Sequence, residues 1–583
     1  MQLAKHPFFA FLFFFIQHFV TAQAIVPIPF DGNKNYSATY DEIMDFWKRL
    51  DTQFREVKLV EYGYSDVGRP IHLVVVSKET DFTPDAIRAK GKSILFINNA
   101  IHAGEPCGVE ASMLLVRDYL TNSEFEHRLD NVALIIIPAY NIGGVLNRNN
   151  STRTNQQGPE WYGFRGNAKN LDLNRDFIKC DSRNARAFTK IMRLWDPDVF
   201  IDTHTSNGAD YSYTITLIAS QWNKQEEGMA KYAQLTMIPE LYRAMSASGW
   251  EMTPYVYARD TPDKGIAGFL DLPRYSSGYA ALFNTFSFIT ESHMLKPFAD
   301  RVAATYTFLD NMTQFLNKEG RSVQKLRQLA KKNTADRNMI DVNWTLDPTK
   351  VDTLFFEGYQ PGYKPSEISG YNRLWYNRKQ PLNKMIPFYN TYKATTTIEK
   401  PKAYIIPQAY DKVIERLRIN GIPLKRLTRD TIIEAYFYRI RAFETTDEPY
   451  ESHYLHSQVV VSDSLEKVQF FKGDYIAPTG LPTDNYLVHV LEPQAADSFF
   501  AWNFFDGILM QKEYFSPYVF EDLAAEYLSK HPELQKQLEE KRNADPDFKA
   551  SAYLQLKFVY EHSPWHEVTY RRYPIGRLGI GKK

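Results

Sequence analysis

The sequence is poor in cysteine and carries no excess charge of either sign. Among its 583 residues are 2 cysteines, and 69 Lys and Arg residues balance 69 Asp and Glu residues. A chain without net charge has no overall field that would draw it to nucleic acid or to an anionic membrane surface. It also lacks a glycine-rich phosphate loop and a dinucleotide-binding fingerprint, which argues against a nucleotide-dependent enzyme. These absences favour a function carried by a local site, with no nucleic-acid partner.

The two cysteines, Cys107 and Cys180, leave the existence of a disulfide open. An exported protein can form such a bridge, but the sequence does not tell whether their Cα atoms lie close enough. Neither cysteine has a second cysteine at a chelating interval, so we expect no metal site at them.

Long apolar runs are also missing, except at the N-terminus. Lys5 gives a short positive start, an apolar run covers residues 7–20, and Ala-Gln-Ala at residues 22–24 offers a small-residue cleavage site. This layout is typical of a secretory signal peptide. A membrane anchor is the alternative, but the run is short for a span and contains two polar residues. We expect residues 1–24 to be removed on export, which leaves a secreted or periplasmic protein without a membrane segment.

Strands and helices alternate through the first half of the chain. A hairpin is predicted over residues 58–77 because both of its arms are rich in β-branched and aromatic residues. The later apolar runs with strand character are SILFINNA, NVALIIIPAYN, DVFIDTHT and TFSFITE. Between them, VEASMLLVRDYL and ARAFTKIMRLW have apolar residues at helical spacing. The pattern predicts an α/β domain over residues 25–335, with a mixed, largely parallel sheet between layers of helices.

The character of the sequence changes after about residue 330. The polar stretch KKNTADRN, residues 331–338, predicts a linker, and a chain of this length is expected to contain at least two domains. The following region carries a strand-helix-strand pattern from KAYIIP to IPLKRL and ends in charged helical segments. We therefore predict a C-terminal α+β domain of unknown role over residues 336–583. Its aromatic stretch at residues 491–507 is expected to form core and domain contacts.

Three residues near strand ends are candidate metal ligands. His102 and Glu105 form an H-x-x-E pair on a turn that enters a helix, where residues three apart face the same way. His204 closes a different strand, and in parallel sheets such ends meet at one edge. Two imidazoles and one carboxylate suit zinc with an open position for water. Glu291, at the end of the run FSFIT, is expected at the same edge.

The H-x-x-E spacing by itself decides nothing. The chain has 13 histidines and contains a second copy of the pattern, His489 to Glu492. That copy follows no strand of the same type and is interpreted as a coincidence. The first copy differs from it because of its sequence neighbours.

Five segments, in one order, resemble the zinc carboxypeptidase family, the carboxypeptidase A-like metallopeptidases. They are INNAIHAGEP, IIPAYNIGG, RGNAKNLDLNRDF, DPDVFIDTHT and FSFITESH, and the turn GYSDVGRPI resembles the start of that domain. The resemblance covers roughly residues 40–320. It implies a zinc peptidase with one Zn²⁺ per chain, held by His102, Glu105 and His204.

The resemblance also implies roles for the residues around the metal. Glu291 would be the general base, and Arg165 would stabilise the oxyanion of the tetrahedral intermediate. Asn174 and Arg175 would bind the terminal carboxylate of the substrate, because a guanidinium makes two parallel bonds to a carboxylate. The alternatives are an ion pair of Arg175 with a neighbouring aspartate and a solvated loop position for Arg165.

A tyrosine that covers the substrate is also implied by the resemblance. The stretch RYSSGYAAL offers Tyr275 and Tyr279, of which Tyr275 is preferred. The spacing to Glu291 departs from the family pattern, so the preferred side chain of the substrate stays unassigned.

Two other functions are compatible with these residues. The same zinc site can hydrolyse amide bonds in cell-wall peptides or N-acyl amino acids, and a non-catalytic binding module can use the same scaffold. The complete set of ligands and base favours an enzyme, and the pair Asn174 and Arg175 favours a substrate with a free carboxylate. The resemblance therefore implies a zinc metallocarboxypeptidase that hydrolyses C-terminal peptide bonds, and the predicted signal peptide implies that it is secreted.

Overall fold

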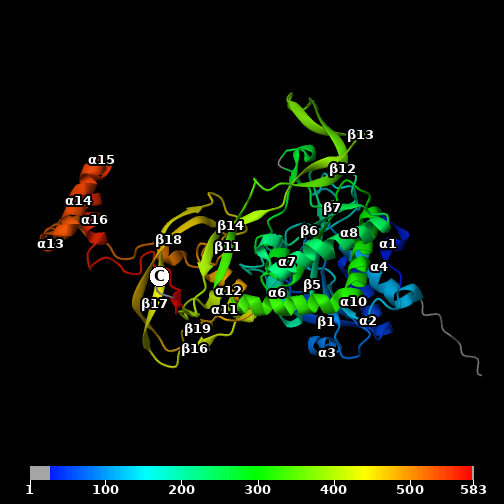
Figure 1. The fold of residues 1–583 in the computed structure, drawn as a ribbon, viewed down its shortest axis with the longest axis horizontal. Coiled ribbons are helices and arrows are strands. Elements are labelled where there is room, and N and C mark those ends of the chain that lie inside the picture. Colours follow the sequence, from blue (N-terminus) through cyan, green and yellow to red (C-terminus); the bar gives the residue numbers. More distant parts are fainter. Residues whose placement is uncertain (1–25, 259, 581–583) are drawn as a thin grey trace, which may run out of the picture.

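An eight-stranded sheet forms the centre of the first half of the molecule (Figure 1). The computed structural model describes residues 26–258 and 260–580, so the predicted signal peptide at 1–24 lies outside the described residues. The strand order is β1-β2-β4-β3-β5-β10-β6-β7. The bounds are β1 Val57–Tyr64, β2 Pro70–Val76, β3 Ser93–Asn98, β4 Val132–Ile137, β5 Val199–Ser206, β6 Ile215–Ala219, β7 Met252–Pro254 and β10 Phe286–His293.

The middle of this sheet is parallel and covered on both faces. Strands β4, β3, β5 and β10 run parallel to their neighbours in that series, and β1 and β2 pair in antiparallel fashion. Strand β6 is antiparallel to β10 and parallel to β7. All residues of β3 and β4 are buried, as parallel strands between two helical layers must be. Helices α4 (Cys107–Thr121) and α10 (Phe298–Asp336) cover one face, and α6 (Arg183–Trp195) and α9 (Ser276–Ala281) cover the other. The predicted mixed, largely parallel sheet between helices is confirmed.

Helix α4 starts close to the sheet because Gly108 has no side chain. A Cβ at this position would lie 2.0 Å from Oγ1 of Thr203 in β5. The Thr203 hydroxyl also donates to Oδ1 of Asn99, at 2.9 Å, in the loop between β3 and α4. This close packing holds the loop that carries the H-x-x-E pair against the carboxyl edge of the sheet.

The prediction of a linker at residues 331–338 is wrong. Helix α10 runs from Phe298 to Asp336, and the next strand, β11 (Met339–Leu346), begins three residues later. The buried Arg327 ties this part of the helix to the sheet domain through ion pairs of 2.8 Å with Asp196 and with Asp198. Lys332 and Asp336 are exposed and Thr334 is buried, so this polar stretch continues the helix although its composition resembles that of a linker.

The second half of the chain adds further sheets, which confirms an additional C-terminal α+β part. Strand β11 pairs with β14 (Tyr392–Glu399), and the long hairpin β12 (Asp352–Pro365) and β13 (Asn372–Tyr389) rises from the main body in Figure 1. A six-stranded sheet has the order β16-β19-β15-β20-β17-β18. Its bounds are β15 Ala403–Ile406, β16 Lys425–Arg426, β17 Thr431–Thr445, β18 His456–Phe470, β19 Tyr475–Pro478 and β20 Gly576–Leu578, with helices α11 Asp411–Ile419 and α12 Asp484–Leu491 beside it.

The two halves are joined by shared sheet structure and buried contacts. Strand β13 pairs in parallel with β9 (Ile266–Ala267), which belongs to the first half and pairs with β8 (Tyr257–Ala258). The aromatic stretch at residues 491–507 is largely buried, and its Asp497 forms a 2.8 Å ion pair with Arg274 of the first half. This bears out the expected role of the stretch in core and domain contacts.

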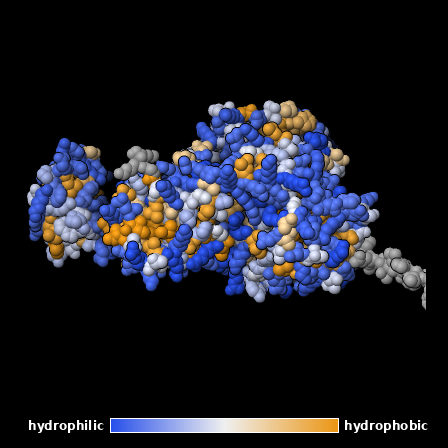
Figure 2. Space-filling model, turned by 60° about the horizontal axis from the view of Figure 1, so that its bottom comes forward, coloured by the Kyte–Doolittle hydropathy of each residue, from blue (hydrophilic) through white to orange (hydrophobic). Residues whose placement is uncertain are grey.

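A small helical arm lies at the far end of the molecule in Figure 1. It comprises α13 (Pro517–Lys530), α14 (Pro532–Ala544), α15 (Pro546–Lys549) and α16 (Ala552–Glu561), which pack around their own apolar cluster. The face drawn in Figure 2 is mainly hydrophilic, with apolar residues gathered beside this arm, in the region of the six-stranded sheet. Within the described residues, no helix has the combined length and apolarity needed to cross a membrane.

Candidate metal centre and active site

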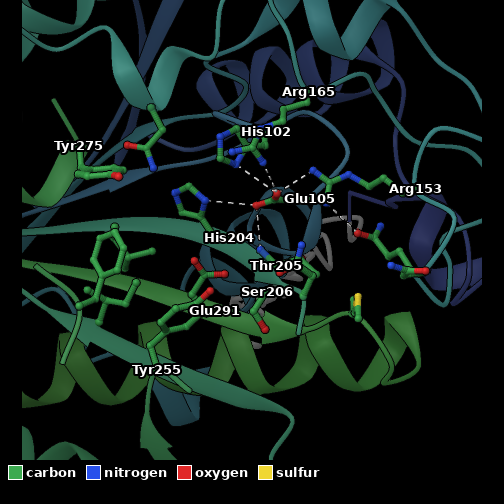
Figure 3. Close-up of a pocket in the computed structure, with 18 of the residues that line it drawn as sticks. His102, Glu105, Arg153, Arg165, His204, Thr205, Ser206, Tyr255, Tyr275 and Glu291 are labelled. Atoms are coloured by element: carbon green, nitrogen blue, oxygen red, sulfur yellow. Dashed lines mark hydrogen bonds and ion pairs between the residues drawn. The ribbon is translucent and has the colours of Figure 1, made fainter. Parts of the chain in front are cut away.

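His102, Glu105 and His204 converge at the carboxyl edge of the sheet. One potential ligand atom from each lies within 4.8 Å of the others, and all three residues are buried. Nδ1 of His102 lies 3.1 Å from Oε1 of Glu105, and Nδ1 of His204 lies 3.2 Å from Oε2. Figure 3 shows the Glu105 carboxylate between the two imidazoles. The three residues that the sequence singled out are therefore brought together.

The other ring nitrogen of each histidine faces an aspartate. Nε2 of His102 lies 2.9 Å from Oδ1 of Asp172, and Nε2 of His204 lies 3.0 Å from Oδ2 of Asp202. Such carboxylates fix the ring orientation and the tautomer of a ligating histidine, leaving Nδ1 as the ligand atom. Nδ1 of His102 is buried and has no contact of this kind besides the one with Glu105, so it is available to a metal ion. The donor set and its supports fit zinc with an open position for water.

Positive charge surrounds the carboxylates of the centre. Burial alone would raise the pKa of Glu105, but His102 and Arg153 outweigh it and hold the pKa well below the usual range. Nη2 of Arg153 lies 2.7 Å from Oε1, and the backbone N–H of Thr205 donates to Oε2 at 2.9 Å. Glu105 is thus ionised and held in place, as a metal ligand must be.

Asp172 is ionised for a related reason. Burial would raise the pKa of this carboxyl, but the charges of His102 and Arg165 hold it well below its usual range. Nη2 of Arg165 lies 2.8 Å from Oδ2 of Asp172, on the side away from the His102 contact. Asp172 therefore contacts both the imidazole of His102, which faces the metal site, and the guanidinium of Arg165, which lines the cavity.

Glu291 lies beside the metal-facing group. Strand β10 pairs in parallel with β5, and this register places Glu291 opposite His204. Burial, with the nearby charge of Glu105 as a further cause, raises the pKa of Glu291 to about 8. A half-buried carboxyl of this kind, next to candidate metal ligands, has the environment expected of a catalytic acid or base.

One cavity of about 510 Å³ contains nearly all of the predicted site residues. The predicted residues that line it are His102, Glu105, Arg165, Asn174, Arg175, His204, Tyr275 and Glu291. They come from different strands and loops of the first half, which shows that the sheet edge gathers them as the alternation of strands and helices predicted.

Asn174, Arg175 and Tyr275 form one wall of the cavity. The guanidinium carbon of Arg175 lies 4.5 Å from the centre of the Tyr275 ring, within the range of a cation–π contact. Oδ1 of Asn174 accepts a hydrogen bond of 2.9 Å from the backbone N–H of Ser276, next to Tyr275. Nη1 of Arg175 donates to the backbone oxygen of Asn174 at 2.8 Å and lies 3.9 Å from Oδ2 of Asp172. The ion pair and the cavity-lining position of Arg175 therefore coexist.

The structure places Tyr279 in the core and not in the cavity, which corrects its assignment as a substrate-binding residue. The side chain is fully buried, and its hydroxyl donates to Oδ1 of Asn420 at 2.6 Å. Its ring packs against Phe177 and Phe283. Both tyrosines belong to one short segment, but helix α9 begins between them and turns their side chains in different directions.

Two cavity residues were missed from the sequence. Arg153 contacts Glu105 directly, and Tyr255 lines the cavity next to Phe269, with ring centres 6.2 Å apart. Arg153 lies in the irregular stretch LNRNNSTRTN, which has no apolar period that would place it at the sheet edge. Tyr255 is one of 37 tyrosines and follows a three-residue strand, so only its position in space distinguishes it.

The remaining candidates show no second site. His489 is buried in α12, where its Nδ1 faces the backbone oxygen of Asn485 and its ring stacks on Trp344. Among the described residues, the one group identified as able to hold a metal is the His102 group, so the second H-x-x-E copy remains a coincidence of spacing. Cys107 and Cys180 are both buried and free, which answers the question of a disulfide.

Comparisons with known proteins find similarity to carboxypeptidases. The family model described as zinc carboxypeptidase matches residues 43–190. Carboxypeptidase 2 of Trichophyton rubrum is 20% identical over 493 residues, covering 79% of this chain and 83% of that protein. Carboxypeptidase 2 of Trichophyton tonsurans is 21% identical over 517 residues, covering 82% and 86% respectively. The solved metallo-carboxypeptidase from Burkholderia cenocepacia gives a TM-score of 0.37 at 17% identity, covering 49% of this chain and 70% of that one.

The matched residues include the H-x-x-E pair and the segment that ends in Asn174 and Arg175. Residues 43–190 thus match the zinc carboxypeptidase family model, and the resemblance predicted from the sequence is confirmed over these residues.

Proposed function

We propose that the protein is a secreted peptidase that removes single residues from the free C-terminus of peptides, with one Zn²⁺ per chain. The proposal assigns the metal to His102, Glu105 and His204 and the terminal carboxylate of the substrate to Asn174 and Arg175. The observation that carries it is that the metal-facing group and the Arg175 guanidinium line the same cavity. An arginine in the cavity wall that binds the terminal carboxylate fixes the position of the substrate's C-terminus. It thereby selects which peptide bond of the substrate lies at the metal ligands.

The residues of the cavity divide the chemistry between them. Bound zinc would supply a Lewis acid that polarises the scissile carbonyl and acidifies a water molecule. Glu291 takes the proton of the attacking water and later delivers it to the leaving amine. Arg165 donates to the carbonyl oxygen as negative charge develops on it. Arg175 holds the terminal carboxylate, so that the bond one residue upstream lies at the reaction centre.

Arg153 is a second candidate for the donor to the carbonyl oxygen. Both arginines approach the same Glu105 oxygen, Arg153 at 2.7 Å and Arg165 at 3.5 Å. Arg165 also pairs closely with Asp172, at 2.8 Å, whereas Arg153 bonds Gln156 at 3.1 Å. Separate replacement of each by Met distinguishes them, because loss of the oxyanion donor lowers kcat and kcat/KM together.

The experiment that tests the proposal is mass spectrometry of a peptide mixture incubated with the purified protein, with and without a chelator. Loss of single C-terminal residues that stops when the metal is removed is the expected result. Peptides with an amidated C-terminus are expected to persist, because they cannot pair with Arg175. Internal cleavage, or cleavage only of cell-wall peptides or N-acyl amino acids, would replace this proposal by the amidase alternative.

The cavity predicts a preference for large apolar C-terminal side chains. Ile289 lies two residues before Glu291 on β10, so both side chains are on the same face of the sheet, and Ile289 pairs with Ile218 of β6. Both isoleucines line the cavity, as does Phe269, whose ring contacts Tyr275 at 5.1 Å. This surface has no charged group to pair with a Lys or Asp side chain.

A matched set of peptides that differ only in the last residue tests this preference. We expect kcat/KM for C-terminal Phe or Leu to exceed that for Asp or Lys by at least about tenfold. The variant Ile289→Asp should lose this preference, with Ile432→Asp on the exposed face of β17 as its control. A wild-type preference for a charged last residue would show that another surface binds the side chain.

Asp172→Asn is expected to weaken zinc binding by about 10–100-fold. A neutral amide oxygen accepts the hydrogen bond from the Nε2–H group of His102 less strongly than a carboxylate does. Zinc dissociation constants measured by competition with a chelator check this. Asp547→Asn, on the exposed surface of α15, is the control. Unchanged zinc affinity in Asp172→Asn would mean that His102 is not oriented by this contact.

The domain limits and the location are part of the proposal. We assign residues 1–24 to a signal peptide, 25–335 to the catalytic domain and 336–583 to the C-terminal region. The N-terminal layout of charge, apolar run and small residues supports export. Sequencing the N-terminus of protein recovered outside the cytoplasm tests it, with a start near residue 25 expected.

A further inference from the structure

A loop of the C-terminal region reaches the catalytic domain behind Arg175. It connects β17 to β18 and contains a tight turn, in which the backbone N–H of Tyr450 donates to the oxygen of His453 at 2.7 Å and the reverse bond is 3.0 Å. Nε2 of His453 lies 2.7 Å from Oδ2 of Asp181, which anchors the turn to the catalytic domain. The turn is therefore held by its own backbone hydrogen bonds and by the contact with Asp181.

Adjacent residues of this turn hold the two ends of one short catalytic segment. The Tyr450 hydroxyl accepts a hydrogen bond of 3.1 Å from Nε of Arg175. Oε2 of Glu451 accepts a hydrogen bond of 2.8 Å from the backbone N–H of Asp172. Asp172 caps the 3-10 turn Leu173–Arg175, so one contact supports the residue behind His102 and the other supports the carboxylate-binding arginine.

The turn adopts a backbone conformation that its residues do not favour. Glu451 has φ +51° and Ser452 has φ +68°, positions of a tight turn where Gly, Asn or Asp is usual. A left-handed conformation at two consecutive non-glycine residues is disfavoured and persists where surrounding contacts require it. Here the conformation directs the Glu451 carboxylate towards Asp172, and this points to a function for the turn.

The Tyr450 ring is held from behind. It stacks on Trp502, with ring centres 6.0 Å apart and planes 20° apart. The guanidinium of Arg274 lies 5.2 Å from the Trp502 ring and 5.6 Å from the Tyr450 ring, and Asp497 pairs with this arginine at 2.8 Å. Trp502 and Asp497 are buried residues of the C-terminal region. The hydroxyl that meets Arg175 therefore has little freedom to move.

These contacts occupy two of the N–H groups of Arg175. A guanidinium has five N–H donors, of which Nε bonds Tyr450 and one on Nη1 bonds the backbone of Asn174. The three remaining donors are the two N–H groups of Nη2 and the second N–H group of Nη1. They form the end of the fork, which can bind a carboxylate with two parallel bonds.

We propose that the β17–β18 loop is a positioning element of the active site, in which Tyr450 orients Arg175 for the terminal carboxylate and Glu451 fixes the backbone of Asp172. The inference rests on the proposed function of Arg175. It gives the C-terminal region a role in specificity for a free carboxylate. Tyr450 acts through Arg175 and does not itself line the cavity.

The test compares the full-length wild type, Tyr450→Phe and the control Tyr454→Phe on paired peptides with free and amidated C-termini. Phe keeps the ring that stacks on Trp502 and removes only the hydroxyl, and Tyr454 is exposed in the same loop. We expect Tyr450→Phe to raise KM for the free peptide about tenfold with kcat little changed. The ratio of free to amidated cleavage falls by the same factor, whereas Tyr454→Phe matches the wild type.

Glu451→Ala provides a second and separate readout. Loss of its carboxylate frees the backbone of Asp172, and we expect zinc to dissociate about tenfold faster, with Tyr450→Phe unchanged in this measurement. If the wild type removes C-terminal residues and Tyr450→Phe keeps its KM and selectivity, the positioning role is wrong while the proposed function stands. If the wild type itself does not distinguish free from amidated peptides, the proposed role of Arg175 fails first.

Discussion

Replacing Glu291 by Gln is expected to lower turnover by about 10²–10⁴-fold while leaving the zinc content unchanged. Gln has nearly the same shape but cannot accept and return a proton. Glu291 faces His204 across the β5–β10 pairing without being one of the three grouped ligands, so zinc should stay bound. Steady-state kinetics and metal analysis on the same sample measure both quantities.

The control for this variant is Glu367→Gln, at the exposed tip of the β12–β13 hairpin, which should behave as the wild type. Circular dichroism and thermal unfolding establish that Glu291→Gln is folded. Normal turnover in Glu291→Gln would show that another group moves the proton. Loss of zinc together with activity would instead make Glu291 a metal ligand.

Replacing Arg175 by Met is expected to lower kcat/KM for peptides with a free C-terminus by about 10²-fold, mainly through KM. The variant removes two charge-assisted hydrogen bonds to the carboxylate. Cleavage of amidated peptides, already slow, should change little because these substrates never use the guanidinium. Arg175→Lys keeps the charge but not the fork and should lie between the wild type and Arg175→Met.

Arg321→Met, on the exposed side of α10, is the matched control for this series. An equal loss on free and amidated peptides would contradict the docking role and indicate that Arg175 supports the site through Asp172 alone. Zinc content measured in parallel separates these outcomes, since Asp172 also contacts His102.

The metal centre was predictable because its residues lie close to strand ends. Buried parallel strands read as short apolar runs, and the residues that end them must meet at one edge of the sheet. His102, His204 and Glu291 followed directly from this rule, and Glu105 from its H-x-x-E spacing to His102. The order of the five segments was also needed to identify the metal site, because the H-x-x-E spacing occurs again at His489.

Residues brought in from loops were not predictable. Arg153 and Tyr255 lie in irregular segments, and Tyr450 comes from a turn 275 residues away from its partner Arg175. No local pattern relates such pairs, because their contact depends on how two whole regions pack. Tyr279 was misassigned because it lies only four positions after Tyr275, and the sequence did not show that helix α9 begins between the two.

The predicted linker failed for a different reason. A polar, charged stretch is typical of a linker and equally of the exposed face of a helix that continues beyond the sheet. Arg327 is buried, and its ion pairs with two aspartates hold the helix in place just before that stretch. Such a buried arginine cannot be distinguished from an exposed one by its sequence alone.

Titration of metal-free protein with Zn²⁺, with C-terminal residue release followed at each step, tests the central claim most directly. The account predicts that activity rises in proportion to added zinc and stops rising at one zinc per chain. A His204→Ala sample should bind zinc weakly and stay inactive at the same point. Full activity without metal, or undiminished activity in His204→Ala, would contradict the assignment of the centre to His102, Glu105 and His204.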